Sequence, residues 1–355
     1  MPIARDYLVL PLGQIALYSS MSSSNTFTNR LSVAAFVVAV ALSPPWAAAE
    51  EPVALEGHDE YVYMISFSRD GKLMATAAGD NRAIVWDLVI RKSLHTLEHD
   101  AAVYAAAISP DGKTVATGTG EKLLSLWQVR DGRRVAQRVE HEDAVYCVEF
   151  SHDGTLLASA GGSTDGGDTT CRMWQADGLK KAAELKGHAR QVYGLAFSPD
   201  DRLLASGSSD KSIRIWNLKN DEFRELKEHT SDVYRIAFSP DQQQLASVSQ
   251  DGSVRIWNLN AGKAVEIHAG GKKNPMYAVA FESDGKSLAA VGDGGRLRFW
   301  RTSDWKLQSE ERISKLPLYA VAFPPGQAIA VTAGEDGKVY LIDRSTTSEK
   351  TAPDR

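Results

Sequence analysis

The chain of 355 residues lacks several features that would assign it to a protein class at once. It contains only two cysteines, which excludes a disulfide framework. It has no long basic run, and its 40 basic and 45 acidic residues leave a net charge of −5, which disfavours nucleic-acid binding. It carries no motif for a nucleophile elbow, a zinc site or a phosphate-binding loop. We therefore expect a protein without enzymatic activity, metal or cofactor.

The chain also lacks an apolar run long enough to span a membrane. The uncharged apolar run at residues 31–42 is 12 residues long, whereas a transmembrane helix needs roughly 20. Arg30 precedes this run and Ala47, Ala48 and Ala49 follow it, a pattern typical of a secretory signal peptide. A buried core helix is the alternative, but the run has no polar residues at helical spacing. We predict cleavage after Ala49 and a periplasmic or secreted protein.

These features divide the chain into three segments. Residues 1–49 are predicted to be an N-terminal extension plus the signal peptide. A signal that began at Met1 would exceed the usual length of about 15–30 residues, so we predict that translation starts at Met21. Residues 50–343 are predicted to form one folded domain, and the polar residues 344–355 a disordered tail.

The predicted domain is built from internal repeats. Each unit contains short apolar runs that are typical of β-strands, such as residues 192–197, 203–206 and 213–216, separated by Asp-Gly or Ser-Asp turns. No segment of the domain has the pattern of a long amphipathic helix. Tryptophan marks the period, recurring every 41 to 47 residues at Trp86, Trp127, Trp174, Trp216, Trp257 and Trp300.

The repeats carry Gly-His near their start and Trp-Asp or Trp-Asn at their end, as in Gly57-His58 with Trp86-Asp87. With this period, the pattern resembles the WD-repeat β-propeller family over about residues 57–343. The resemblance implies an all-β fold, a seven-bladed β-propeller of four-stranded antiparallel blades. Only the polar tail follows Asp343, so residues 53–55 are predicted to supply the last outer strand and close the ring.

The resemblance also implies a buried hydrogen-bonded set of His, Ser or Thr, Asp and Trp in each regular repeat. Such a set looks like a hydrolase triad, but its recurrence on the repeat period favours an architectural role. The expected structural sets are His58, Thr76, Asp80 and Trp86; His141, Ser159, Asp168 and Trp174; His188, Ser206, Asp210 and Trp216; and His229, Ser247, Asp251 and Trp257.

Three blades depart from this pattern. Blade two is expected to place Glu121 beside His99 in the position of the aspartate. Blade six has Ala290 where the serine is expected, and blade seven has Ser314 at the histidine position and Ile342 at the tryptophan position. Their apolar strands persist, so we expect all three to be propeller blades.

The two cysteines are expected to remain unpaired. Cys147 lies on the predicted first strand of blade three and Cys171 on the third. One strand lies between them, which separates them by roughly 9–10 Å, too far for a disulfide. We expect both to be small buried apolar side chains.

A tyrosine follows the first apolar residue of the innermost strand in every repeat. The resemblance places this position at the mouth of the central channel, on the face that the family uses most for partners. The rings either plug the mouth or form a rigid contact surface of the kind that dominates protein interfaces. The predicted partner-binding tyrosines are Tyr63, Tyr104, Tyr146, Tyr193, Tyr234, Tyr277 and Tyr319.

A second set of partner-binding positions precedes the turn aspartate of each blade. It is Gly or Ser in blades one to four, which leaves the rings uncovered, and Gln250, Asp293 and Glu335 in blades five to seven. An insertion before the first strand of blade six adds Lys272 and Lys273 to the same face. The acidic side of this mouth suits a basic or amine-bearing peptide.

These features predict a non-catalytic interaction scaffold that displays a tyrosine-lined mouth to a protein or peptide partner outside the cytoplasm. Two alternatives stay open. One is an enzyme or small-ligand binder that uses the channel mouth, and the other is a structural subunit that binds an envelope complex through its blade edges. We expect a monomer or a subunit of a hetero-complex, with no nucleic-acid partner and no stable membrane insertion after signal cleavage.

Overall fold

The structure is a computed structural model that describes residues 52–345, except 164–166, 221, 262 and 269–273. The predicted signal peptide and start at Met21 lie outside the described residues, as do Lys272 and Lys273. Within these limits the chain forms 28 β-strands. The described part of the chain contains no helix with the length and apolar character needed to cross a membrane.

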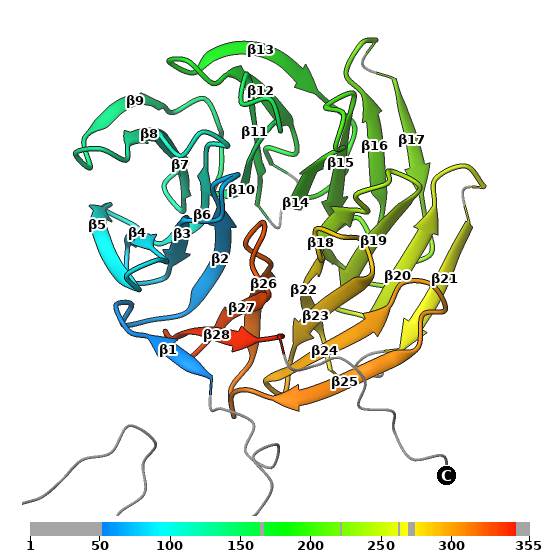
Figure 1. The fold of residues 1–355 in the computed structure, drawn as a ribbon. Helices are drawn as coiled ribbons and strands as arrows, with labels where there is room; N and C mark the ends of the chain where they lie inside the picture. Colours follow the sequence, from blue (N-terminus) through cyan, green and yellow to red (C-terminus); the bar gives the residue numbers. More distant parts are fainter. Residues whose placement is uncertain (1–51, 164–166, 221, 262, 269–273, 346–355) are drawn as a thin grey trace, which may run out of the picture. The chain divides into compact units, whose positions relative to one another are not determined.

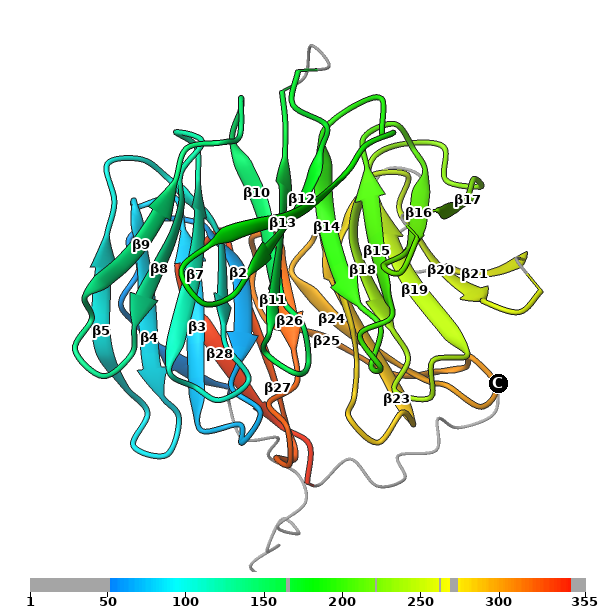
Figure 2. The same cartoon turned by 90° about the horizontal axis from the view of Figure 1, so that it is seen from above.

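The strands form seven sheets of four antiparallel strands each, arranged as blades around a central axis (Figure 1). The view at right angles shows the innermost strands running along this axis (Figure 2). Each innermost strand contacts those of the two neighbouring blades, and β2 of blade one contacts β26 of blade seven, so the ring is closed. The predicted seven-bladed β-propeller is confirmed.

Each blade has the same strand order from the centre outward. The innermost strands are β2 (Val62–Phe67), β6 (Val103–Ile108), β10 (Val145–Phe150), β14 (Val192–Phe197), β18 (Val233–Phe238), β22 (Met276–Phe281) and β26 (Leu318–Ala322). The second strands are β3 (Leu73–Ala78), β7 (Thr114–Thr119), β11 (Leu156–Gly161), β15 (Leu203–Ser208), β19 (Gln244–Ser249), β23 (Ser287–Gly292) and β27 (Ile329–Gly334). The third strands are β4 (Arg82–Asp87), β8 (Leu124–Gln128), β12 (Cys171–Gln175), β16 (Ile213–Asn217), β20 (Ser253–Asn258), β24 (Arg296–Arg301) and β28 (Val339–Asp343). The outer strands are β5 (Lys92–Glu98), β9 (Arg134–Arg138), β13 (Lys180–Leu185), β17 (Phe223–Leu226), β21 (Lys263–His268), β25 (Leu307–Arg312) and β1 (Val53–Leu55).

In blades one to five, the turns between first and second strands follow the Ser-x-Asp pattern of the sequence. In blade one Ser68 Oγ donates to Asp70 Oδ1 over 2.7 Å, and the same oxygen accepts the backbone N–H of Lys72. Gly71 follows with a φ of 68°, a conformation that glycine adopts without strain. These short polar turns explain why strands of about six residues recur without helices between them.

The hydrophobic core lies between the blades rather than at the centre of the ring. Trp86 of blade one shares a buried cluster with Val331 and Leu341 of blade seven. In blade seven, Ile342 takes the tryptophan position and is buried with Phe299 of blade six. Each blade therefore buries its third strand against the preceding blade, and no blade completes its core alone.

The N-terminal strand closes the ring as predicted. β1 pairs with β28 in antiparallel register, with Val53 opposite Leu341 and Leu55 opposite Val339. The Leu55 side chain is 6% exposed within the cluster of blades seven and one, whereas Val53 is 42% exposed. Strands from the two ends of the domain thus complete one blade and leave no unpaired edge there.

The two cysteines are free and buried, as expected. Cys147 is on β10 and Cys171 is on β12, with β11 between them. Burial is the main reason that the pKa of Cys171 is raised to about 12, so its thiol stays protonated at neutral pH.

Candidate functional site

A β-bulge places the tyrosine of every innermost strand at the channel mouth. In blade one, Val62 pairs with Ala78 and Met64 pairs with Ala77, so Tyr63 is the extra residue of the bulge. A bulge bends its strand and re-aims the side chain that it carries. The same shift in register falls on Tyr104, Tyr146, Tyr193, Tyr234, Tyr277 and Tyr319.

The seven tyrosines form a closed ring of aromatic contacts. Six neighbouring pairs have ring centroids 5.0 to 5.4 Å apart, in tilted or edge-to-face arrangements. The seventh pair, Tyr63 and Tyr319, is 6.1 Å apart, and Tyr61 packs against both. Each of the seven side chains is half-buried, so one part of it contacts its neighbours and another part meets solvent.

Two glycines beside the tyrosine ring leave the side chains of Tyr63 and Tyr104 uncovered. A Cβ at Gly79 would lie 3.4 Å from Tyr63 Oη and 2.9 Å from Glu60 Oε2. A Cβ at Gly120 would lie 3.3 Å from Tyr104 Cε2. Side chains at these two positions would therefore press on the tyrosines of blades one and two.

Carboxylates surround the tyrosine ring. Tyr319 Oη donates to Glu335 Oε2 over 2.9 Å. Burial, followed by the charge of Asp232, raises the pKa of Tyr193 to about 12, and burial with Asp293 also raises the pKa of Tyr277. The phenols therefore stay protonated at neutral pH and act as hydrogen-bond donors beside negative charges.

The sequence analysis missed three of the carboxylates that lie beside the tyrosine ring, namely those of Glu60, Asp143 and Asp232. Glu60 and Asp143 lie three residues before the tyrosines of blades one and three, and Asp232 lies two residues before that of blade five. Each has an electrostatic influence on its tyrosine. The offset from the repeated tyrosine is the signal that would have found them. Arg190 takes the corresponding place in blade four, so the acidic rim is interrupted there.

The other predicted rim residues are placed differently. Asp293 and Glu335 are half-buried beside Tyr277, as expected. Gln250 is exposed, and its Oε1 accepts a hydrogen bond from Ser231 Oγ over 2.7 Å. The predicted contribution of Lys272 and Lys273 cannot be placed, because both lie outside the described residues.

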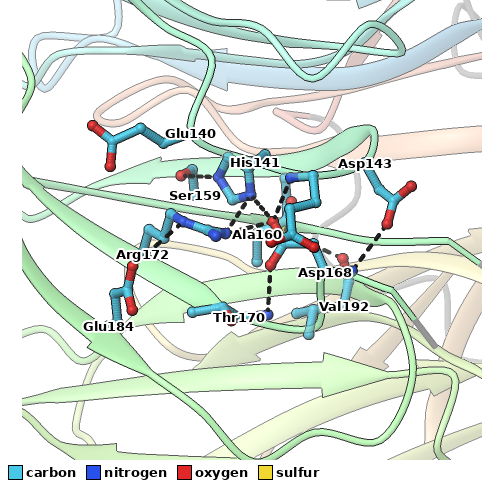
Figure 3. Close-up of polar contacts among 12 residues, drawn as sticks. Glu140, His141, Asp143, Ser159, Ala160, Asp168, Thr170, Arg172, Glu184 and Val192 are labelled. Carbon is cyan, nitrogen blue, oxygen red and sulfur yellow. Dashed lines mark hydrogen bonds and ion pairs between the residues drawn. The ribbon is translucent and has the colours of Figure 1, made fainter.

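The predicted structural sets form chains of buried hydrogen bonds, and Figure 3 draws the histidine, serine and aspartate of the set in blade three. Trp174 Nε1 donates to Ser159 Oγ over 2.8 Å, Ser159 lies 2.7 Å from His141 Nε2, and His141 Nδ1 lies 2.9 Å from Asp168 Oδ2. Blades one, four and five repeat the three contacts at 2.7 to 3.0 Å with His58, Thr76, Asp80 and Trp86; His188, Ser206, Asp210 and Trp216; and His229, Ser247, Asp251 and Trp257.

These sets are unsuited to nucleophilic catalysis. The serine or threonine hydroxyl of each set already accepts a hydrogen bond from the tryptophan indole, and Ser159 is fully buried. A nucleophile must reach its substrate, and this one is sealed inside the blade. Across the described residues, no group of three or more His, Cys, Asp or Glu side chains is placed to hold a metal ion.

An arginine extends the set of blade three (Figure 3). Arg172 Nη1 donates to Asp168 Oδ2 over 2.5 Å, and Arg172 Nε lies 3.9 Å from Glu184 Oε1 on the outer strand. Burial opposes the charge of Asp168, but the hydrogen bonds from His141 and Arg172 outweigh it and hold the pKa of this carboxyl below its usual range. Three further blades repeat the cross-strand ion pair, as Arg214–Glu225, Arg255–Glu266 and Arg298–Glu310.

The expectation for blade two was wrong. Glu121 is exposed, and neither ring nitrogen of His99 has a hydrogen-bond partner among the described residues. In the regular blades the short aspartate also caps its own turn, as Asp80 Oδ1 does for the N–H of Arg82. Glutamate has a longer side chain and does not make this turn. Trp127 Nε1 still donates to Thr117 Oγ1 over 2.9 Å, so only part of the set remains.

The unpaired His99 predicts a pH-dependent stability. Burial, assisted by Arg134, lowers the pKa of His99 to about 4 from 6.5. The unfolded chain therefore takes up a proton that the folded protein resists, and stability falls as the pH drops from about 6.5 towards about 4. We expect His99→Phe to remove about 1–2 kcal/mol of the stability difference between pH 7.5 and pH 5. Urea unfolding at the two pH values measures this. An unchanged difference would show that His99 is not the group that resists protonation.

Blade seven replaces the histidine set with another polar cluster. Ser314 Oγ donates to Asp336 Oδ2 over 3.0 Å, and Tyr340 Oη donates to the same oxygen over 2.7 Å. Tyr340 thus supplies a hydrogen bond to the aspartate that histidine supplies elsewhere. The sequence analysis noted Ser314 at the histidine position but missed Tyr340, which lies two residues before the tryptophan position.

Two family models match the chain. The model described as the IFT122 first beta-propeller matches residues 102–354, well over half of the chain. The model described as the WD domain, G-beta repeat, matches residues 50–87. No curated protein is similar enough to be matched.

Proposed function

Because the chain belongs to the WD-repeat β-propellers, within the family of the IFT122 first β-propeller, we propose that it is a non-catalytic scaffold that binds a protein or peptide partner through its tyrosine mouth. WD-repeat propellers commonly mediate protein–protein interaction and are typically without enzymatic activity. Our proposal is more specific than this general role of the family in three respects: the kind of partner, the face that binds it, and the location outside the cytoplasm.

The closed tyrosine ring is the observation that carries the proposal. Seven bulges on one repeat period present seven rings at the same end of the channel. If the tyrosines only plugged the channel, larger side chains at positions 79 and 120 could cover them. Gly79 and Gly120 instead leave Tyr63 and Tyr104 uncovered. Tyrosine gives a large contact area at low entropic cost, and these rings are already fixed by their neighbours. A partner therefore docks without having to order the surface.

The acidic rim supports a partner segment that is basic or carries amines. Glu60, Asp143, Asp232, Asp293 and Glu335 all influence neighbouring tyrosines. Opposite charges across an interface raise the rate of association and select the partner more than they raise affinity. Lysine or arginine side chains would also meet the faces of the aromatic rings.

The rim predicts salt-sensitive binding of a basic peptide. A fluorescein-labelled peptide of alternating lysine and serine is expected to bind the wild type at low salt and to weaken as salt screens the rim. Asp232→Asn combined with Glu335→Gln is expected to weaken this binding about tenfold. The matched control is Asp241→Asn with Asp284→Asn, exposed turn residues at the other end of the blades. Fluorescence anisotropy measures both. Equal losses in the two double variants would place the binding elsewhere.

The location outside the cytoplasm rests on the apolar run at residues 31–42 and the alanines that follow it. N-terminal sequencing of the protein from its native cell tests it. Glu50 as the first residue of an exported protein supports the proposal, and a cytoplasmic protein that retains residues 31–42 contradicts it.

A further inference from the structure

Two charged residues interrupt an otherwise neutral wall below the tyrosine ring. The positions one and three residues after each tyrosine hold Glu149 in blade three and Arg235 in blade five. The same positions in blades two, six and seven hold only alanine, those of blade four hold Gly194 and Ala196, and those of blade one are uncharged. Core packing in the other blades therefore does not require a charge at this level of the strands.

Glu149 and Arg235 both line a cavity of about 250 Å³ in the centre of the propeller. Tyr63 lies at one end of its lining, and His152 and Pro199 follow the opposite ends of their innermost strands. The remaining lining residues have apolar side chains and come from innermost strands of several blades. Apolar side chains together with a few convergent polar groups are the usual lining of a small-molecule site.

The two charges are not satisfied by the protein. Among the described residues, nothing donates a hydrogen bond to the Glu149 carboxylate, and no ion pair joins it to Arg235. Arg235 donates one hydrogen bond, from Nη1 to the backbone carbonyl of Tyr193 over 2.5 Å, although a guanidinium has five N–H groups. Both side chains are half-buried, so solvent reaches them within the cavity.

Partial burial nevertheless disfavours the ionised form of both side chains. Burial raises the pKa of Glu149 to about 7, against the attraction of Arg235, and burial lowers the pKa of Arg235. The surroundings thus destabilise the ionised form of each side chain, and no counter-charge is bound to either of them. A single anion or cation would satisfy one of them and leave the other unpaired.

We propose that the channel cavity binds a small zwitterion of the α-amino acid class, with its ammonium group on Glu149 and its carboxylate on Arg235. The guanidinium offers the planar pair of donors that a carboxylate accepts. The cavity volume equals that of about eight water molecules, which admits a small amino acid and excludes a folded partner. This site lies below the tyrosine ring and does not depend on the proposed binding of a protein.

Calorimetric titration of the protein with glycine, L-alanine and L-threonine tests the proposal, with acetate and methylammonium as singly charged probes. We expect at least one amino acid to bind, and both singly charged probes to bind at least about tenfold more weakly. Binding is expected to raise the unfolding temperature, and the rise is expected to grow with the logarithm of the ligand concentration once that concentration exceeds the Kd.

Glu149→Ala and Arg235→Ala are the variants of choice, because alanine occupies these positions in other blades and the fold tolerates it there. Each is expected to weaken amino-acid binding at least about tenfold, while Glu311→Gln, exposed on the outer strand of blade six, leaves it unchanged. Circular dichroism establishes that the variants are folded. Absence of heat and of thermal stabilisation with all three amino acids, or equal binding by the folded variants, would overturn the proposal.

Discussion

A chain that begins at Gly57, and so lacks β1, is expected to be at least about 3 kcal/mol less stable than a chain that begins at Glu50 and to associate through β28. The loss has two causes. Leu55 leaves the cluster between blades seven and one, and the ladder between β1 and β28 disappears. Urea unfolding measures the stability, and size-exclusion chromatography measures the association.

Val53→Ala is the matched control for this prediction, since Val53 is in the same strand but largely exposed. It is expected to change stability by less than about 0.5 kcal/mol. Leu55→Ala should lie between the two, at about 2–3 kcal/mol. A shortened chain that stays monomeric and unfolds at the same urea concentration would show that the ring does not depend on its N-terminal strand.

Asp168→Ala is expected to destabilise the protein by about 3–5 kcal/mol, the cost of leaving a buried charge without its partner. Asp168 is 5% exposed and Arg172 is 7% exposed, and the substitution removes the acceptor of both Arg172 Nη1 and His141 Nδ1. Because the fold depresses the pKa of Asp168 below 3.8, its stabilisation is present above that pH and is lost as the pH falls further. The variant should therefore lose less stability in acid than the wild type.

Two further variants separate the buried pair from a general effect on blade three. Asp153→Ala removes an exposed turn aspartate of the same blade and is expected to cost about 1 kcal/mol or less. Arg172→Met in the Asp168→Ala background removes the unpaired guanidinium and is expected to recover part of the loss. If Asp153→Ala costs as much as Asp168→Ala, the ion pair has no special role.

The fold followed from the sequence because each repeat carries its own strand and turn signals. Ring closure also followed, since residues 53–55 form a short apolar run just before the first repeat, in the position of an outer strand. The prediction for blade two failed because the sequence shows only that Glu121 carries the same charge as an aspartate. It does not show that the glutamate side chain is too long to cap the turn as aspartate does. Residue type alone does not give this geometry.

The tyrosine ring was visible in the sequence as a strict period, but the bulge that aims each ring was not. The roles of Glu60, Asp143 and Asp232 depend on which residues surround the bulged tyrosines in space. Glu149 and Arg235 stand out only after the strands are aligned on the bulge and the cavity is known. Residues that differ from their equivalents in the other blades indicate individual sites. The structure is needed to show where these residues lie relative to one another.

The most direct test of the proposed function is capture of a partner by a chain that begins at Glu50, with and without Tyr193→Ala and Tyr234→Ala. Extract of the cell envelope supplies the partner, and equal circular dichroism establishes equal folding. Phe223→Ala with Val265→Ala, exposed on the outer strands of blades four and five, is the matched control. The account predicts a partner that the wild type and the outer-strand variant retain and the tyrosine variant loses. A partner retained by the tyrosine variant and lost by the outer-strand variant would contradict it and assign binding to the blade edges.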